Sequence, residues 1–150
     1  MFLKVLKNFE RCRCIVTDKH FHDTLINLEC VPNKSLILKF PNKSIFKENH
    51  LINSFVRGYV DGDGCYWVNK NGKLQIEIIG TLEFLTSIQE EYNNLFGSIL
   101  SLSRGCTPDK NTFRIMSSNK KAIEFINLIY RDSTIFLQRK YDKIATFLEN

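Results

Sequence analysis

The stretch Val56-Arg57-Gly58-Tyr59-Val60-Asp61-Gly62-Asp63-Gly64 decides how this chain folds. It closes a segment from about Asn49 to Val60 whose apolar residues recur with the spacing of one helix face, and the glycines that follow predict where that helix ends. A helix C-terminus carries partial negative charge, so Asp61 and Asp63 lower stability there unless a cation offsets them. The motif therefore suggests a metal site at the end of the helix.

A row of small residues is the second feature of this helix. Ser54, Gly58 and Gly62 fall four positions apart on one side, although each glycine inside a helix costs about 1 kcal/mol relative to alanine. Small side chains let a second helix approach closely, which would bring two acidic helix ends together. Paired carboxylates can hold Mg²⁺, which binds through one or two carboxylates plus substrate phosphates. The alternative is that Asp-Gly-Asp-Gly forms a solvated turn.

Composition bounds the class of protein. The chain has 150 residues, of which 43% are apolar, enough to fold as one domain without covalent help. Its net charge of +5 favours a polyanionic partner without establishing one. Five cysteines form no C-x-x-C pair, which indicates reduced thiols, and the three histidines lack the spacing of metal ligands. With no signal peptide and no membrane-spanning run, we expect a soluble, intracellular protein.

The periodicity of the rest of the chain predicts alternating helices and strand pairs. Helices are expected over Leu82 to Phe96, Lys121 to Tyr130 and Thr134 to Leu148, and strands over Cys65 to Lys70, Leu74 to Ile79, Ser98 to Ser103 and Thr112 to Ser117. An Asn-Gly pair joins the first two strands as a hairpin. The order from Asn49 onward is αββαββαα, an α+β fold, preceded by a connector packed on the surface from Val31 to Asn49.

An internal similarity links the two ends of the chain. Shifting the sequence by 101 positions aligns Cys12-Arg13-Cys14-Ile15 with Phe113-Arg114-Ile115-Met116, and Leu25 with Ile126. Both segments have the pattern of a strand that leads into a helix, but few residues are identical. The similarity is either coincidence or a repeat. If it is a repeat, residues 1–48 are the tail of a preceding repeat plus a linker, and 49–150 are a complete domain.

The motif resembles the LAGLIDADG motif of homing endonucleases, through Arg57-Gly58-Tyr59-Val60-Asp61-Gly62-Asp63-Gly64. The segment Cys30-Val31-Pro32-Asn33-Lys34-Ser35-Leu36 resembles the linker before the second motif of two-repeat members. The closing stretch, from Ile135 to Lys143, and the αββαββ order resemble that family as well. The chain holds a single motif, because nothing in residues 1–50 matches the first one.

The resemblance implies an αββαββα fold whose four-stranded antiparallel sheet forms a saddle along DNA, with motif helices at a dimer or pseudo-dimer interface. Asp63 would bind Mg²⁺ or Mn²⁺, with Gly62 beside it, and Asp61 would support the helix end. Lys140 would lie near the scissile phosphate and stabilise developing charge. The metal would activate water, and Asp63 from each half would contribute to cutting each strand.

Strand alternation indicates which sheet face would meet DNA. If Tyr66, Val68, Leu74, Ile76 and Ile78 point to the helices, the intervening residues point to the groove. The expected DNA-binding residues are Cys65, Trp67, Asn69, Lys70, Lys73, Gln75, Glu77, Arg104, Lys110, Arg114 and Arg139. Ordinary solvent exposure explains each polar residue equally well, and the exposed indole of Trp67 is the best single test.

The leading functional hypothesis is a site-specific double-strand DNA endonuclease of the homing type, a divalent-metal-dependent hydrolase. It would act as a homodimer, or with a partner chain that supplies a second motif helix. The alternative is a module of the same fold that binds DNA or intron RNA without cutting, because only one motif is present. A basic interaction protein with no nucleic-acid role is the third class.

Overall fold

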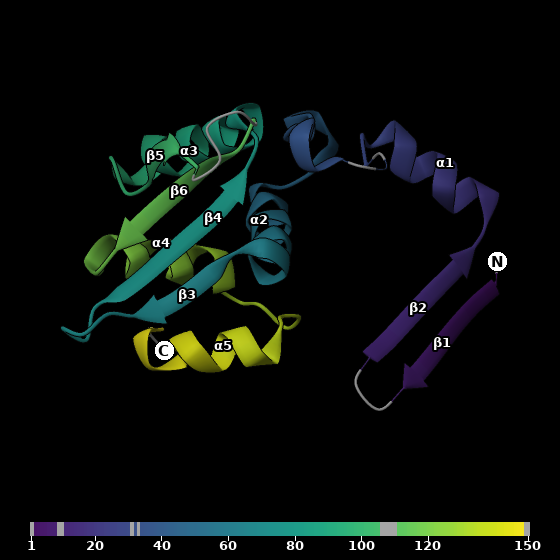
Figure 1. Cartoon of the computed structure of the whole chain (residues 1–150). Coiled ribbons are helices and arrows are strands. Elements are labelled where there is room, and N and C mark those ends of the chain that lie inside the picture. Colours follow the sequence, from purple (N-terminus) through teal and green to yellow (C-terminus); the bar gives the residue numbers. More distant parts are fainter. Residues whose placement is uncertain (1, 9–10, 31, 33, 106–110, 149–150) are drawn as a thin grey trace. The chain divides into compact units, whose positions relative to one another are not determined.

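The computed structural model describes residues 2–8, 11–30, 32, 34–105 and 111–148 (Figure 1). The chain divides into two compact units, Met1–Lys34 and Ser35–Asn150, which are described separately below. Within the described ranges, none of the helices combines the length and the apolar character needed to cross a bilayer.

The smaller unit is a β-hairpin followed by a helix. Strands β1 (Phe2–Asn8) and β2 (Arg11–Thr17) pair antiparallel, and α1 (Lys19–Asn27) follows. The side chain of Asp18 caps α1 by accepting a hydrogen bond from the backbone N–H of Phe21 at 2.7 Å. None of the described residues of α1 is buried. This unit therefore consists of a strand pair leading into a helix.

The larger unit contains the motif. Its main elements are α2 (Asn49–Asp63), β3 (Cys65–Val68), β4 (Leu74–Gly80), α3 (Leu82–Phe96), β5 (Ser101–Arg104), β6 (Phe113–Ser118), α4 (Lys120–Tyr130) and α5 (Gln138–Ile144). The four strands form one antiparallel sheet in the order β3-β4-β6-β5. The predicted order αββαββαα and the α+β fold class with a four-stranded antiparallel sheet are confirmed.

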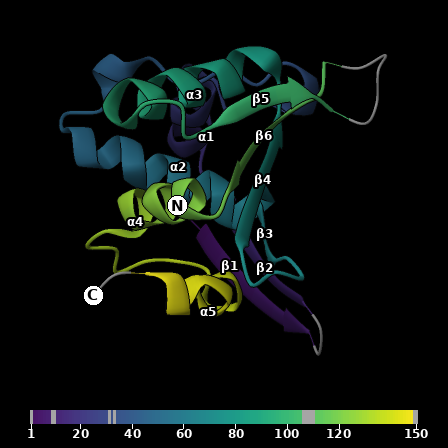
Figure 2. The same cartoon turned by 90° about the vertical axis from the view of Figure 1, so that its left-hand side faces the viewer.

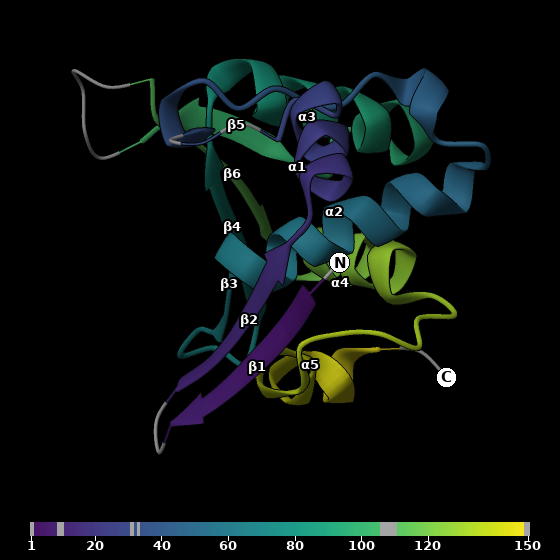
Figure 3. The same cartoon turned by 90° about the vertical axis from the view of Figure 1, so that its right-hand side faces the viewer.

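The helices cover one face of this sheet. Figures 2 and 3 show α2, α3 and α4 on the same side of β3 to β6. Apolar residues of β4 alternate toward them: Leu74, Ile76 and Ile78 are buried, whereas Gln75 and Glu77 are half-buried on the other face. The core between sheet and helices therefore leaves one sheet face open, as the period-2 pattern predicts.

The predicted helix from Thr134 to Leu148 is wrong at its start. The α-helix begins at Gln138 and is followed by a 3-10 turn over Ala145–Phe147. Leu137 stays extended, and its N–H donates a hydrogen bond to the carboxylate of Asp61 at 2.9 Å. This tertiary hydrogen bond therefore holds Leu137 extended, and the helix begins one residue later, at Gln138.

The strand predicted from Ser98 starts at Ser101 instead. The N–H groups of Ile99 and Leu100 both donate to the side chain of Asn93, at 3.0 and 2.9 Å. These hydrogen bonds hold the segment against α3 and take its donors away from the sheet.

The apolar periodicity of the strand at Cys65 to Lys70 and of the helix at Leu82 to Phe96 predicts that Val68, Leu95 and Phe96 face the core, but all three are exposed, and each lies at the end of an element. Val68 is the last residue of the edge strand β3, and it is 48% exposed. Leu95 and Phe96 close α3, where the helix runs past the core. Periodicity gives the direction of a side chain but does not show where its covering neighbours stop.

The connector packs on the larger unit. Residues 35–48, which the sequence analysis grouped with the linker, contain Phe40 and Phe46, whose rings lie 5.3 and 5.6 Å from the ring of Phe55 on α2. The carbonyl of Leu38 accepts a hydrogen bond from the hydroxyl of Thr81. The surface packing predicted for the connector is thus built on aromatic contacts with α2.

Candidate functional site

The buried carboxylate at the end of α2 is Asp61. It is 8% exposed and accepts hydrogen bonds from the hydroxyl of Tyr130, at 2.5 Å, and from the N–H of Leu137. Burial raises the pKa of the Tyr130 phenol, and its bond to Asp61 raises that pKa further. Asp61 therefore joins α2 to α4 and to the segment before α5.

The cation at this helix end comes from the chain itself. The ammonium of Lys140, on α5, donates to the carbonyls of Val60 at 2.8 Å, Gly64 at 2.5 Å and Gly62 at 3.4 Å. These carbonyls belong to the turn where the helix dipole is most negative, so a cation stabilises them. Burial, helped by the charge of Arg139, lowers the pKa of Lys140.

Lys140 therefore provides the positive charge that the acidic helix end was expected to obtain from a metal ion. Its side chain is 6% exposed, and its ammonium points to backbone oxygens of the helix end. Its expected role beside a scissile phosphate stays a prediction.

Asp63 has the opposite environment, because its side chain is exposed at the last position of α2. The charge of Asp63 affects the neighbouring phenol of Tyr59. Burial raises the pKa of that phenol to about 12, and the negative charge of Asp63 contributes to the increase. In the parts of the chain that the structure describes, no group of three or more His, Cys, Asp or Glu residues could hold a metal. One chain thus offers a single free carboxylate here.

The row of small residues on α2 faces open space. A Cβ placed on Gly58 or Gly62 would meet no described atom within 4 Å, and Ser54 is half-buried. Within the described part of the larger unit, nothing packs against a Cβ at either glycine of the predicted helix interface.

Arg57, which was not predicted as a site residue, holds α2 in place. Its guanidinium donates to the carbonyl of Ile129 at 2.9 Å and to that of Ile135 at 3.1 Å. The available signal was a basic residue within the apolar part of the helix, because a half-buried guanidinium needs carbonyl or carboxylate partners.

The open sheet face carries a continuous set of polar residues. Trp67 pairs with Gln75, and Cys65 pairs with Glu77, across β3 and β4. Cys65 and Trp67 are exposed. On the adjacent β6, the guanidinium of Arg114 lies 3.4 Å from the Glu77 carboxylate and donates to the Ser103 hydroxyl at 3.2 Å. The structure thus brings most of the predicted sheet residues to one face.

Other predicted DNA-binding residues lie elsewhere. The amide oxygen of Asn69 accepts from the N–H groups of Asn71 and Lys73 and so builds the hairpin turn. Arg104 is paired with Phe113, a residue that packs against the core, so Arg104 falls on the helix side at the end of β5.

The remaining basic residues of that set lie on the surface or outside the description. Lys70, Lys73 and Arg139 are exposed, the first two at the β3–β4 hairpin and the third on α5. Lys110 lies outside the described residues. Of these residues, Lys70 and Lys73 adjoin the open sheet face.

Comparison with known proteins gives a distant structural likeness. No family model matches the chain, and no curated protein matches it. Among solved structures, the chain is similar to the crystal structure of a homing endonuclease, I-TnaI, with 14% identity and a TM-score of 0.45. The similarity covers 63% of this chain and 67% of that chain.

Proposed function

We propose that the protein is a site-specific double-strand DNA endonuclease of the homing type, which cuts by metal-dependent phosphodiester hydrolysis. The observation that carries this proposal is the geometry of α2. A helix face open at Gly58 and Gly62 ends in the exposed carboxylate of Asp63. A second helix of the same kind packed there would place two carboxylates side by side.

The open sheet face supports DNA as the partner. It presents an indole, an amide and an Arg–Glu pair, groups that recognise base edges in a major groove. The net charge of +5 favours binding to phosphates in addition.

The residues present fit a shared Mg²⁺ or Mn²⁺ site. Mg²⁺ is commonly held by one or two carboxylates together with water and substrate phosphate, so Asp63 from each of two chains is sufficient. The Gly62 carbonyl fits less well, because it already accepts a hydrogen bond from Lys140. When bound, the metal would activate water and stabilise the leaving oxygen.

The partner in this proposal is a second motif helix, from a homodimer or from another chain. In each chain, the contacts of Asp61 with Tyr130 and of Lys140 with the Val60 carbonyl stabilise the C-terminal end of α2. Asp63 stays free to face the partner.

A second candidate is a non-cleaving module that binds DNA or intron RNA. The position of Lys140 favours it, because an ammonium committed to three backbone carbonyls is poorly placed to stabilise charge on a phosphate. Both candidate functions use the open sheet face to bind nucleic acid. They differ in whether Asp63, at the end of α2, binds a metal ion for cleavage.

Replacing Asp63 separates them. The target would be selected from a random duplex library by binding to the wild-type protein. We expect Asp63→Asn to abolish Mg²⁺-dependent nicking of that target, while binding in Ca²⁺ is retained, because the amide removes a metal-ligating charge. Asp142→Asn, an exposed change on α5, is the matched control and should cut normally.

Unchanged nicking by Asp63→Asn would refute the metal assignment. A wild-type protein that binds the selected duplex but never cuts it would favour the binding module.

A further inference from the structure

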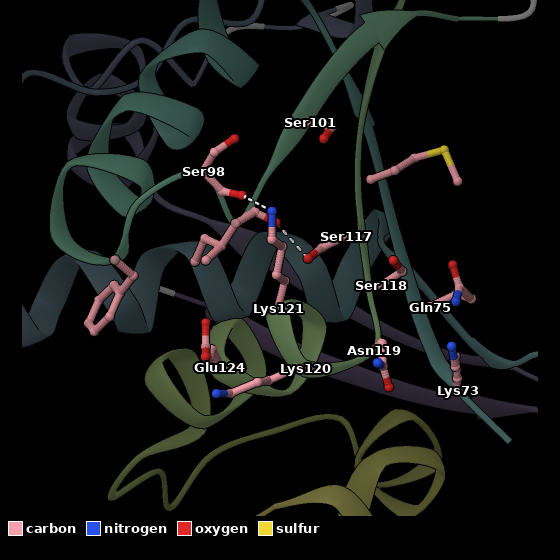
Figure 4. A pocket seen from close by; sticks show the side chains of 13 residues that line it. Lys73, Gln75, Ser98, Ser101, Ser117, Ser118, Asn119, Lys120, Lys121 and Glu124 are labelled. Atoms are coloured by element: carbon pink, nitrogen blue, oxygen red, sulfur yellow. Dashed lines mark hydrogen bonds between the residues drawn. The ribbon is translucent and has the colours of Figure 1, made fainter.

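A hollow of about 710 Å³ lies in the larger unit, where β4 begins, β6 ends and α4 begins (Figure 4). The size is within the range of about 300 to 1,000 Å³ typical of small-molecule sites. It exceeds the volume of a phosphate group alone, so a phosphate with its attached sugar can enter.

The lining is rich in cations and hydrogen-bond donors. Lys73, Lys120 and Lys121 contribute three positive charges, against one negative charge from Glu124. Serine hydroxyls and the Asn119 and Gln75 amides add neutral donors. A pocket of this composition favours an anion that accepts several hydrogen bonds.

The hollow is held in shape by contacts among its own walls. The Lys121 ammonium donates to the Ser98 carbonyl at 2.6 Å, joining α4 to the segment between α3 and β5. The N–H of Asn119 donates to the Leu74 carbonyl at 2.7 Å, which fixes the start of α4 to β4. Figure 4 shows Lys73 and Asn119 near each other on one side of the hollow and Lys120 on another.

The open sheet face leads into this hollow. Trp67 pairs with Gln75, and Gln75 pairs with Ser118, so this row crosses from β3 to β6 and ends in the lining. In the next row Glu77 pairs with Met116, which pairs with Ser101, and the last two are again lining residues. An extended ligand on the sheet face would therefore enter the hollow without a break in the surface.

We propose that this hollow binds a phosphate group, which in the proposed function is a backbone phosphate of the nucleic-acid strand that crosses the open sheet face. Lys120 and Lys73 would neutralise it from opposite sides, and the Asn119 and Ser118 side chains would donate hydrogen bonds. The source of the phosphate rests on the proposed function, whereas the affinity for phosphate does not.

Lys120→Glu tests the proposal, with Lys47→Glu as the matched control. Lys120 is the first residue of α4, where a carboxylate is favourable to the helix, so weaker binding would not come from unfolding. Lys47 is also exposed and is not among the residues that line the hollow. Both variants change the net charge by the same amount.

Two measurements are made on each full-length protein. The first is the shift of the backbone amide signals of residues 120–122 on titration with inorganic phosphate. The second is the dependence of duplex affinity on salt, whose logarithmic slope falls in magnitude by about one for each phosphate that the protein no longer neutralises. We expect Lys120→Glu to abolish the phosphate-induced shift and to reduce the slope by about one unit or more, while Lys47→Glu matches the wild type.

The outcomes separate this proposal from the proposed function. Phosphate binding in the hollow is refuted if the wild type shows no saturable shift and Lys120→Glu keeps the full salt slope. If Trp67→Ala weakens duplex binding in the same experiments, DNA binding by the sheet face is still supported. If phosphate binds and Lys120→Glu abolishes it, but no protein binds duplex, the hollow is supported as a site for free phosphate and the nuclease proposal fails.

Discussion

At the residue scale, two carboxylates in one motif have opposite roles. Asp61 and Asp63 are two positions apart, which places them on nearly opposite sides of a helix with 3.6 residues per turn. Asp61 consequently faces Tyr130 and Leu137, whereas Asp63 faces solvent. Their chemistry follows from this separation, since only the exposed carboxylate can reach a ligand.

The stability of two variants should reveal this difference. Asp61→Asn replaces a buried acceptor of two hydrogen bonds, and we expect the free energy of unfolding to fall by about 1 to 3 kcal/mol. Asp63→Asn is an exposed change and should alter it by less than about 0.5 kcal/mol. Urea denaturation of both variants measures the effect, and equal losses would contradict the assigned roles.

At the element scale, α2 has one buried side and one side that is open to a partner helix. One side packs on the sheet through Val56 and Val60, which are fully buried, and the other side carries the open glycine row. Contacts among the described residues of the larger unit thus do not offset the intrinsic cost of glycine in a helix. A helix approaching from outside would recover it.

Gly58→Leu should therefore act in opposite directions on stability and association. Removing a helical glycine raises the free energy of unfolding of the monomer by about 0.5 to 1 kcal/mol, and a Cβ at this position would meet nothing within 4 Å outside its own stretch of helix. The same side chain should prevent close helix packing and abolish a dimer, as judged by sedimentation. Asn94→Leu, an exposed change on α3, is the control and should leave association unchanged.

A Gly58→Leu protein that associates as the wild type does would rule out this face as the interface. A less stable monomer would show that the row is already covered.

The element order was predictable because each element carries its own period. The hairpin between β3 and β4 was located by the pair Asn71-Gly72, and Gly72 has the positive φ of 72° that favours glycine in a turn. The start of α5 was not predictable, since it depends on the bond between Leu137 and Asp61. Local pattern therefore indicated which elements form, and distant contacts decided where they begin.

At the scale of the whole molecule, α2, β3 and α4 each contribute a tyrosine whose side chain is buried or half-buried. The hydroxyls of Tyr66 and Tyr130 lie 3.4 Å apart, and Tyr59 donates to the Ile79 carbonyl at 2.8 Å. Burial raises the pKa of all three phenols, to about 12 in the case of Tyr59. Folding consequently depends on these groups staying protonated.

Stability should fall as the pH rises above about 10, the ordinary pKa of tyrosine. Above that value the unfolded chain releases phenolic protons that the folded chain retains, so the free energy of unfolding decreases with pH. Burial also raises the pKa of Tyr92, which adds a fourth phenol to this effect. The lowered pKa of Lys140 acts in the opposite sense below pH 10.5, but it is one group against four phenols. Urea denaturation at pH 9 and pH 11 measures the change, and Tyr59→Phe should reduce it.

A free energy of unfolding that is constant between those two pH values would contradict the retention of the phenolic protons. Asn94→Ala, an exposed change that removes no titratable group, serves as the control and should leave the pH dependence as it is in the wild type.

The sequence by itself determined the order of elements, the open sheet face and the position of the motif at a helix end, because periodicity and turn residues are local properties. It also indicated that the acidic helix end needs a cation. Only the tertiary structure decided which cation lies there, since Lys140 meets the Val60 carbonyl across 80 residues of chain. No local pattern encodes so distant a partner, and the burial that makes the contact strong exists only once α5 has docked.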